Sequence, residues 1–252
     1  MKASPNVTSS ITIFGDIHGN LPALEAVLHD IDTRRLANLY CLGDLVGYGT
    51  FPNEVVNLIR QRGIPTLMGN YDQGVGNSST DCGCAYKTEI ERRRGERSIA
   101  WSNAHTTDDN KAFLRVLPAH IPVSLGDLNV LLVHGSPRKV NEYMFVDRPD
   151  DYFERILDGA GVDVLVCGHT HLPYHKVLPS GRHVINAGSV GKPKDHDPRA
   201  GYTILRVSGR DVSVEFIRLT YDIERTAQAI EATPEEGGMP HPYAQMLRDG
   251  AG

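Results

Sequence analysis

The sequence has few of the features that mark secreted or membrane proteins. Only four of its 252 residues are cysteine, and two of these, Cys41 and Cys167, lie in apolar runs typical of buried strands. Reduced thiols therefore fit better than a disulfide framework. No apolar run precedes Ile11, and no stretch is long enough to span a membrane. We expect a cytoplasmic protein without a membrane partner.

Basic residues are also fewer than acidic ones. The formal net charge is -5, from 26 Lys and Arg residues against 31 Asp and Glu residues. A protein that coats long nucleic acid needs a basic surface, because its attraction grows with the number of phosphates that it neutralises. We therefore expect no stable complex with long nucleic acid, although a local basic cluster still suits a short polyphosphate.

The composition that remains is ordinary for a globular protein. Hydrophobic residues make up 40% of the chain and charged residues 23%. A length of 252 residues suits one domain with a substantial core. We predict a single domain over residues 1–252, with an inserted helical cap-like segment at about 73–118 and a C-terminal surface tail at about 233–252.

Strands and helices alternate at the start of the chain. An apolar strand at 11–14 precedes helically spaced apolar residues at 21–31, and a strand at 39–42 precedes a helix at 54–62 and a third strand at 64–68. This alternation predicts neighbouring parallel strands joined by right-handed crossovers. Polar residues that follow such strands gather at one edge of the sheet, where α/β proteins bind ligands.

The second half of the chain is mostly β. We predict a hairpin from 121–125 and 129–133, strands at 162–167, 174–178, 183–186, 202–207 and 212–219, and helices at 150–157 and 222–232. The hairpins suggest a second sheet that packs against the first.

Side chains that can bind metals follow several of these strands. Asp16 and His18 lie two residues apart, so they share one face of an extended chain. The other candidate ligands are Asp44, Asn70, His134, His169 and His171. Seven ligands are too many for one ion, but they suit two ions that share a carboxylate, and Asp44, next to Gly43, is the natural bridge. The alternative is that these residues only pack or cap the strand ends.

These residues also carry a family resemblance. The motifs Asp16-x-His18, Gly43-Asp44, Gly69-Asn70, His134 and Gly168-His169-Thr170-His171 resemble, in order, those of the calcineurin-like metallophosphoesterase superfamily, and most of all its small single-domain bacterial and archaeal phosphodiesterases. The resemblance spans residues 14–191. It implies an α/β fold, a four-layer α-β-β-α sandwich in which two mixed β-sheets are flanked by helices. It also implies one ion held by Asp16, His18, Asp44 and His171, and a second held by Asp44, Asn70, His134 and His169.

The donor set and the resemblance together define the expected chemistry. Imidazole nitrogen and hard oxygen donors, with no thiolate, suit two divalent transition-metal ions; manganese is our first choice, and iron, zinc, cobalt and nickel are alternatives. A hydroxide that bridges the ions would attack phosphorus in line. We expect a hydrolase of phosphoric esters or anhydrides, preferably a phosphodiesterase or a hydrolase of nucleotide polyphosphates such as dinucleoside polyphosphates. A phosphomonoesterase, a nuclease and a non-catalytic interaction scaffold are the alternatives.

Tyr71 departs from the family pattern. The family usually has a histidine directly after the asparagine, where it can protonate the leaving oxygen. A phenol with an ordinary pKa near ~10 donates less readily at neutral pH. Tyr71 is therefore a candidate catalytic residue, a candidate surface for stacking a nucleobase, or a packing residue. A weak acid here favours small, nucleotide-like substrates whose leaving group is already stable as an anion.

Two further residues are candidate substrate contacts. Asn20 follows the first metal motif and also suits the cap of the next helix. Arg199 follows the glycine-containing turn at 186–189 and is our preferred phosphate contact, with an ion pair to Asp195 or Asp197 as the competing interpretation. The pair Cys82 and Cys84 has the spacing to bind a soft metal, but no second pair completes a zinc site nearby, and we expect a local structural role.

Overall fold

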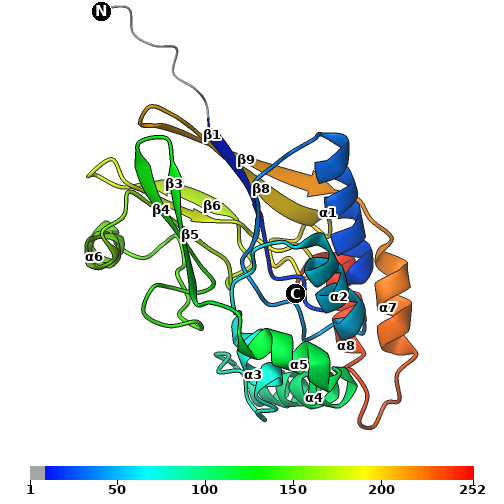
Figure 1. The fold of residues 1–252 in the computed structure, drawn as a ribbon. Coiled ribbons are helices and arrows are strands. Elements are labelled where there is room, and N and C mark those ends of the chain that lie inside the picture. Colours follow the sequence, from blue (N-terminus) through cyan, green and yellow to red (C-terminus); the bar gives the residue numbers. More distant parts are fainter. Residues whose placement is uncertain (1–8) are drawn as a thin grey trace, which may run out of the picture.

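The computed structural model describes residues 9–252 (Figure 1), and within this range the strands form two sheets. The four-stranded sheet has the order β2-β1-β8-β9, built from Leu39–Cys41, Ser9–Phe14, Ala200–Ser208 and Asp211–Leu219. The five-stranded sheet has the order β3-β4-β5-β7-β6, built from His120–Leu125, Leu128–Val133, Val164–Cys167, His183–Asn186 and Tyr174–Val177. Strands β1 and β2 are parallel, as are β4, β5 and β7, and the other pairs are antiparallel.

Helices cover the outer face of each sheet. Helices α1 (Leu21–Thr33), α2 (Pro52–Arg62) and α7 (Ile223–Glu231) lie on the side of the four-stranded sheet, and α6 (Asp150–Ala160) lies beyond the five-stranded sheet (Figure 1). This arrangement confirms the α/β prediction of two mixed sheets flanked by helices.

Successive side chains of a strand point to opposite faces of its sheet, and apolar side chains cover both faces. In β5, Val164 and Val166 point into the core between the two sheets, whereas Leu165 and Cys167 pack toward α6. Strand β8 does the same: Leu205 joins the core between the sheets, and Ile204 packs on the helical side. Because successive side chains of a strand point to opposite faces, one apolar run serves two interfaces.

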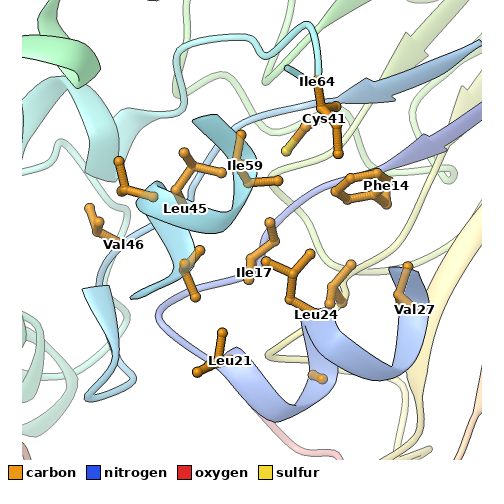
Figure 2. Packing of buried hydrophobic residues seen from close by; sticks show 14 of the residues in the cluster. Phe14, Ile17, Leu21, Leu24, Val27, Cys41, Leu45, Val46, Ile59 and Ile64 are labelled. Atoms are coloured by element: carbon orange, nitrogen blue, oxygen red, sulfur yellow. The ribbon is translucent and has the colours of Figure 1, made fainter. Parts of the chain in front are cut away.

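Helix α1 fixes the first metal motif against this core. It begins after Asn20, whose Oδ1 accepts a hydrogen bond from the backbone N–H of Ala23 at 3.3 Å. Leu24 and Val27 pack beside Phe14 and Ile17, as Figure 2 shows. The turn between β1 and α1 is therefore held at both of its ends by buried contacts.

One prediction about secondary structure was wrong. Residues 64–68 do not form a full strand, because a single parallel bridge joins Thr66 to Cys41 and Pro65 has no N–H to donate to a ladder. The segment at 233–252, where we predict a surface tail, contains helix α8 (Pro242–Asp249), in which Tyr243 and Leu247 are buried in a cluster with Trp101.

The segment at 73–118 contains most of three helices. Helices α3 (Asn70–Gly76), α4 (Glu89–His105) and α5 (Asp108–Arg115) gather at one end of the molecule (Figure 1). Val75, Ile99 and Leu114 belong to the same buried cluster as α1, so these helices extend the main core. Over residues 9–252, no helix combines the length and the apolar character needed to cross a membrane.

Candidate metal centre

The structure brings all seven candidate ligands together. Four strand ends and the start of α3 converge there, and each of the seven residues is at most 3% exposed. Their donor atoms include two compact groups, Asp16 with His18 and His171, and Asp44 with His134 and His169; within each group the atoms lie within 4.8 Å of one another. Each group takes residues from the ends of both sheets.

Asp44 lies between the two groups. Its Oδ2 is 3.4 Å from Nε2 of His134 and 3.6 Å from Nε2 of His18. Its Oδ1 accepts a hydrogen bond from the backbone N–H of Tyr71 at 2.8 Å, which fixes the carboxylate plane. The Oδ1 atom of Asn70 is 3.1 Å from Nε2 of His134, so Asn70 adds an oxygen donor to the second group.

Backbone carbonyls orient the imidazoles. Nδ1 of His18, His134 and His171 donates to the carbonyl oxygens of Val46, Leu42 and Lys192, at 3.1, 2.9 and 2.5 Å. A neutral imidazole that donates through Nδ1 carries its lone pair on Nε2, which is the form that binds metals.

Because of these tautomers, the lone pairs of several ligand atoms point toward one another with no proton between them. Nε2 of His18 lies 3.1 Å from Nε2 of His171, which is itself 3.1 Å from Oδ1 of Asp16. Oδ1 of Asp16 and Nε2 of His169 are buried and have no hydrogen-bond partner among the described residues. Buried acceptors that converge in this way are unfavourable unless a cation lies among them, so the donor set fits divalent metal ions.

Burial keeps most of these imidazoles neutral. It lowers the pKa of His18 to about 3 and lowers the pKa values of His169 and His171 well below their usual value. Burial also disfavours the charged form of His134, but the adjacent Asp44 carboxylate outweighs it and raises the pKa of His134 to about 10. Three imidazoles are therefore already in the unprotonated state that metal binding requires.

The backbone at the ligands is strained. Asp16, His18, Asp44, His169 and His171 have φ values of 51°, 52°, 53°, 64° and 62°. The left-handed region costs a residue other than glycine roughly 1–2 kcal/mol, and such strain gathers at functional sites. Gly69 in the adjoining motif makes room for a carboxylate, because a Cβ there would lie 2.1 Å from Oδ1 of Asp44.

Two residues that orient this site were missed in the sequence. The buried carboxylate of Asp72 accepts backbone N–H bonds from Asp44, Leu45 and Gly69 at 2.7, 2.9 and 3.0 Å, and burial raises its pKa to about 7. Its position three residues after Gly69, at a helix start, is the available signal. Nδ2 of Asn186 donates to the Gly168 carbonyl and to Oγ1 of Thr170, at 2.7 and 3.0 Å, and so holds the loop that carries His169 and His171.

The two predicted substrate contacts, Asn20 and Arg199, are engaged in interactions within the protein. Both polar atoms of the Asn20 amide are occupied, by Ala23, Gly191, Tyr221 and Thr226. Arg199 is half exposed and pairs with Asp197 at 2.7 Å, as in the competing interpretation. These contacts favour structural roles for both residues.

Tyr71 is fully buried, with its ring centroid 4.7 Å from that of Tyr48 and 5.5 Å from that of His18. Burial raises the pKa of its phenol well above 10. A ring covered in this way cannot stack on a nucleobase, so the packing interpretation is favoured.

Two lysines, Lys192 and Lys194, lie near the ligand groups. In addition to burial, the charge of Lys194 lowers the pKa values of His169 and His171, and the carboxylates of Asp16 and Asp44 in turn act on the pKa of Lys194. Burial nevertheless lowers the pKa of Lys194. A partly buried ammonium beside two ligand groups is well placed to contact an anion.

Comparison with known proteins gives a consistent result. The profile of the calcineurin-like phosphoesterase superfamily domain matches residues 10–210. An uncharacterised protein of Methanocaldococcus jannaschii is 35% identical over 241 residues, which cover 89% of this chain and 93% of that protein. A metallophosphoesterase from Sphaerobacter thermophilus is 29% identical with a TM-score of 0.73, over 97% of this chain and all of that one. A hypothetical protein from Pyrococcus horikoshii OT3, 23% identical over 96% of this chain and 98% of that one, has the same fold with a TM-score of 0.78.

Proposed function

The chain belongs to the calcineurin-like phosphoesterase superfamily, and from this premise we propose that it is a dinuclear metal-dependent hydrolase of small nucleotide-like phosphodiesters or phosphoanhydrides. The observation that carries the proposal is the position of Asp44, whose Oδ2 lies within 3.6 Å of an imidazole nitrogen in each ligand group. One carboxylate between two sets of donors is the arrangement that a pair of cations requires.

We assign the first ion to Asp16, His18, Asp44 and His171, and the second to Asp44, Asn70, His134 and His169. The proposed metal is manganese, although the donors also suit iron, zinc, cobalt and nickel. When bound, two such cations supply Lewis acidity and a water nucleophile that is activated at neutral pH.

Residues of the protein orient the metal ligands and neutralise the charge of the substrate. The three carbonyl acceptors hold the imidazoles of His18, His134 and His171 in their metal-binding tautomers. The ammonium group of Lys194 would bind a phosphoryl oxygen of the substrate through a charge-assisted hydrogen bond.

The substrate class follows from the residue after Asn70. Because Tyr71 is buried and its pKa is raised, this position delivers no proton at neutral pH. Leaving groups that are stable as anions, such as nucleoside phosphates or aryl oxides, are therefore favoured over alkoxides. This is the support for phosphoanhydrides, including dinucleoside polyphosphates, and for aryl phosphodiesters.

A panel of substrates tests both the reaction and its selectivity. Rates with added Mn²⁺ would be measured for diadenosine tetraphosphate, bis(p-nitrophenyl) phosphate, p-nitrophenyl phosphate and glycerol phosphate. We expect the first two to react fastest, and an Asp44→Asn variant to lose both ions and almost all activity. Preference for glycerol phosphate would overturn the substrate class. Inactivity on the whole panel with each of the five metals would overturn the hydrolase and favour an interaction scaffold.

A further inference from the structure

The segment Cys82–Gly83–Cys84 lies against the metal centre. It belongs to the connection between α3 and α4, and its two Sγ atoms are 3.0 Å apart. Cys82 is 6% exposed and Cys84 is half-buried. A pocket of about 300 Å³, whose lining includes Asn70, Cys82, Gly83 and Asn141, opens beside them. Small solutes in this pocket can therefore approach the Cys82 side of the pair.

This segment holds the side-chain amide of Asn70. Nδ2 of Asn70 donates to the carbonyl oxygen of Cys82 at 3.0 Å and to Sγ of Cys84 at 3.2 Å. An amide nitrogen has two N–H donors, so both are used. With the nitrogen fixed, Oδ1 points the other way, toward Nε2 of His134 at 3.1 Å. The cysteine segment thus determines that an oxygen, and not a nitrogen, faces the second ligand group.

The segment is itself held in place. Nδ2 of Asn141 donates to the Gly83 carbonyl at 2.8 Å, and N–H of Gly83 donates to Oδ1 of Asp81 at 2.9 Å. Gly83 has a φ of +68°, and a Cβ there would lie 2.5 Å from Nδ2 of Asn141. Glycine between the cysteines permits the tight turn that brings the two sulfurs together.

We propose that Cys82 and Cys84 are a redox-active dithiol that orients Asn70 while reduced, and that their oxidation to a disulfide weakens the second metal site. The inference depends on the proposed function only in assigning Asn70 to the second ion.

The chemistry needs an oxidant of the peroxide or disulfide class. With hydrogen peroxide, one thiolate attacks a peroxide oxygen, the O–O bond breaks, and water leaves after proton transfer, which gives a sulfenic acid; the second thiol then displaces a second water to form the S–S bond. Two sulfurs lose one electron each, and the peroxide is reduced to two waters. A disulfide bond of about 2.05 Å requires the sulfurs to approach by about 1 Å. Closing this gap displaces at least one of the two sulfurs, and our proposal is that the displacement breaks the hydrogen bond between the Asn70 amide and Sγ of Cys84.

The test uses the full-length protein loaded with Mn²⁺ and treated with hydrogen peroxide or glutathione disulfide. Mass spectrometry after alkylation should find the peptide that contains Cys82 and Cys84 lighter by two hydrogens and unalkylated. Cys41 and Cys167, which are fully buried, serve as internal controls and should stay reduced. Titration with Mn²⁺ should show the second ion bound about 10–100-fold more weakly, the range for loss of a residue that orients a ligand, and dithiothreitol should restore it.

Matched variants separate the switch from a merely structural role. Cys82→Ser removes the disulfide partner but keeps the backbone acceptor and Cys84, so oxidant should no longer change the affinity for the second ion. Cys84→Ala removes the sulfur acceptor and should weaken the second ion without oxidant, whereas Cys84→Ser, which keeps an acceptor, should restore much of the affinity.

Failure of the switch and failure of the hydrolase give different results. An active enzyme whose disulfide forms while both ions keep their affinity, or in which no disulfide forms with excess oxidant, overturns this inference alone. An inactive protein that still loses one ion reversibly on oxidation supports the inference and overturns the hydrolase.

Discussion

Replacing Gly69 by alanine tests how strictly the position of Asp44 is set. A Cβ at residue 69 would lie 2.1 Å from Oδ1 and 2.3 Å from the backbone nitrogen of Asp44, whereas ordinary contact begins at 3.4 Å. The backbone of Gly69 is extended, with a φ of -84°, so alanine adds no conformational strain of its own. The whole effect must therefore come from the collision, which displaces Asp44 or its loop by about 1 Å.

That displacement is large for a metal ligand. Ligand distances in metal sites vary by roughly 0.2 Å, and a misplacement of about 1 Å in an active site lowers the rate about 100-fold. We expect Gly69→Ala to bind fewer than two Mn²⁺ ions per chain at concentrations that saturate the wild type, and to hydrolyse bis(p-nitrophenyl) phosphate about 100-fold more slowly. Overpacking should lower the free energy of unfolding by about 1–3 kcal/mol, which urea unfolding would measure.

Gly159→Ala is the matched control. Gly159 lies in α6, and its Cβ would meet no atom within 4 Å. This variant should keep both ions and full activity, and it should gain about 0.4–1 kcal/mol in the free energy of unfolding, because alanine restricts the unfolded chain. Two ions bound with wild-type affinity and an unchanged rate in Gly69→Ala would refute the reasoning.

Three further predictions concern the surroundings of the ligands. Asp72→Asn turns one acceptor oxygen into an N–H donor that faces backbone N–H groups, and urea unfolding of the metal-free protein should show a loss of about 2–3 kcal/mol. The metal-free protein should also lose stability as the pH falls from 6.5 toward 3. The imidazole of His18 binds a proton near pH 6.5 in the unfolded chain but only near pH 3 in the folded protein, so acid favours the unfolded state. A urea midpoint that stays constant over this pH range would contradict this prediction. Lys194→Ala should raise KM about tenfold, the equivalent of one charge-assisted hydrogen bond, with both ions retained, whereas Arg199→Ala should leave KM unchanged; the reverse order would restore Arg199 as the phosphate contact.

The position of the ligands could be predicted because strand ends converge. His134 directly follows β4 and His169 closely follows β5, and apolar runs of these lengths are readable from sequence alone. Parallel neighbours then place such residues at one sheet edge. The same reasoning overextended the strand at 64–68, because the local pattern does not show how few backbone bonds Pro65 permits.

The residues around the ligands could not be predicted in this way. Asp72 acts on the backbone of Asp44, which is 28 positions away and in a left-handed conformation, and no periodic pattern encodes such a contact. Lys194 and Arg199 lie five residues apart in one loop, and only its path decides which of them turns toward the ligands. Helix α8 is short, and it is stabilised by tertiary packing against Trp101 more than by its own propensity.

The distribution of the ligands over both sheets also has a mechanical consequence. Each ion in our assignment would act as a cross-link between the two layers, which are otherwise joined by apolar contacts such as those of Val166 and Leu205. Binding that requires both layers in register adds its free energy to their association. Association of the two sheets and metal binding are therefore coupled. A substitution that weakens the packing between the sheets, far from any ligand, lowers the affinity for metal, and removal of the ions by a chelator lowers the stability of the whole sandwich.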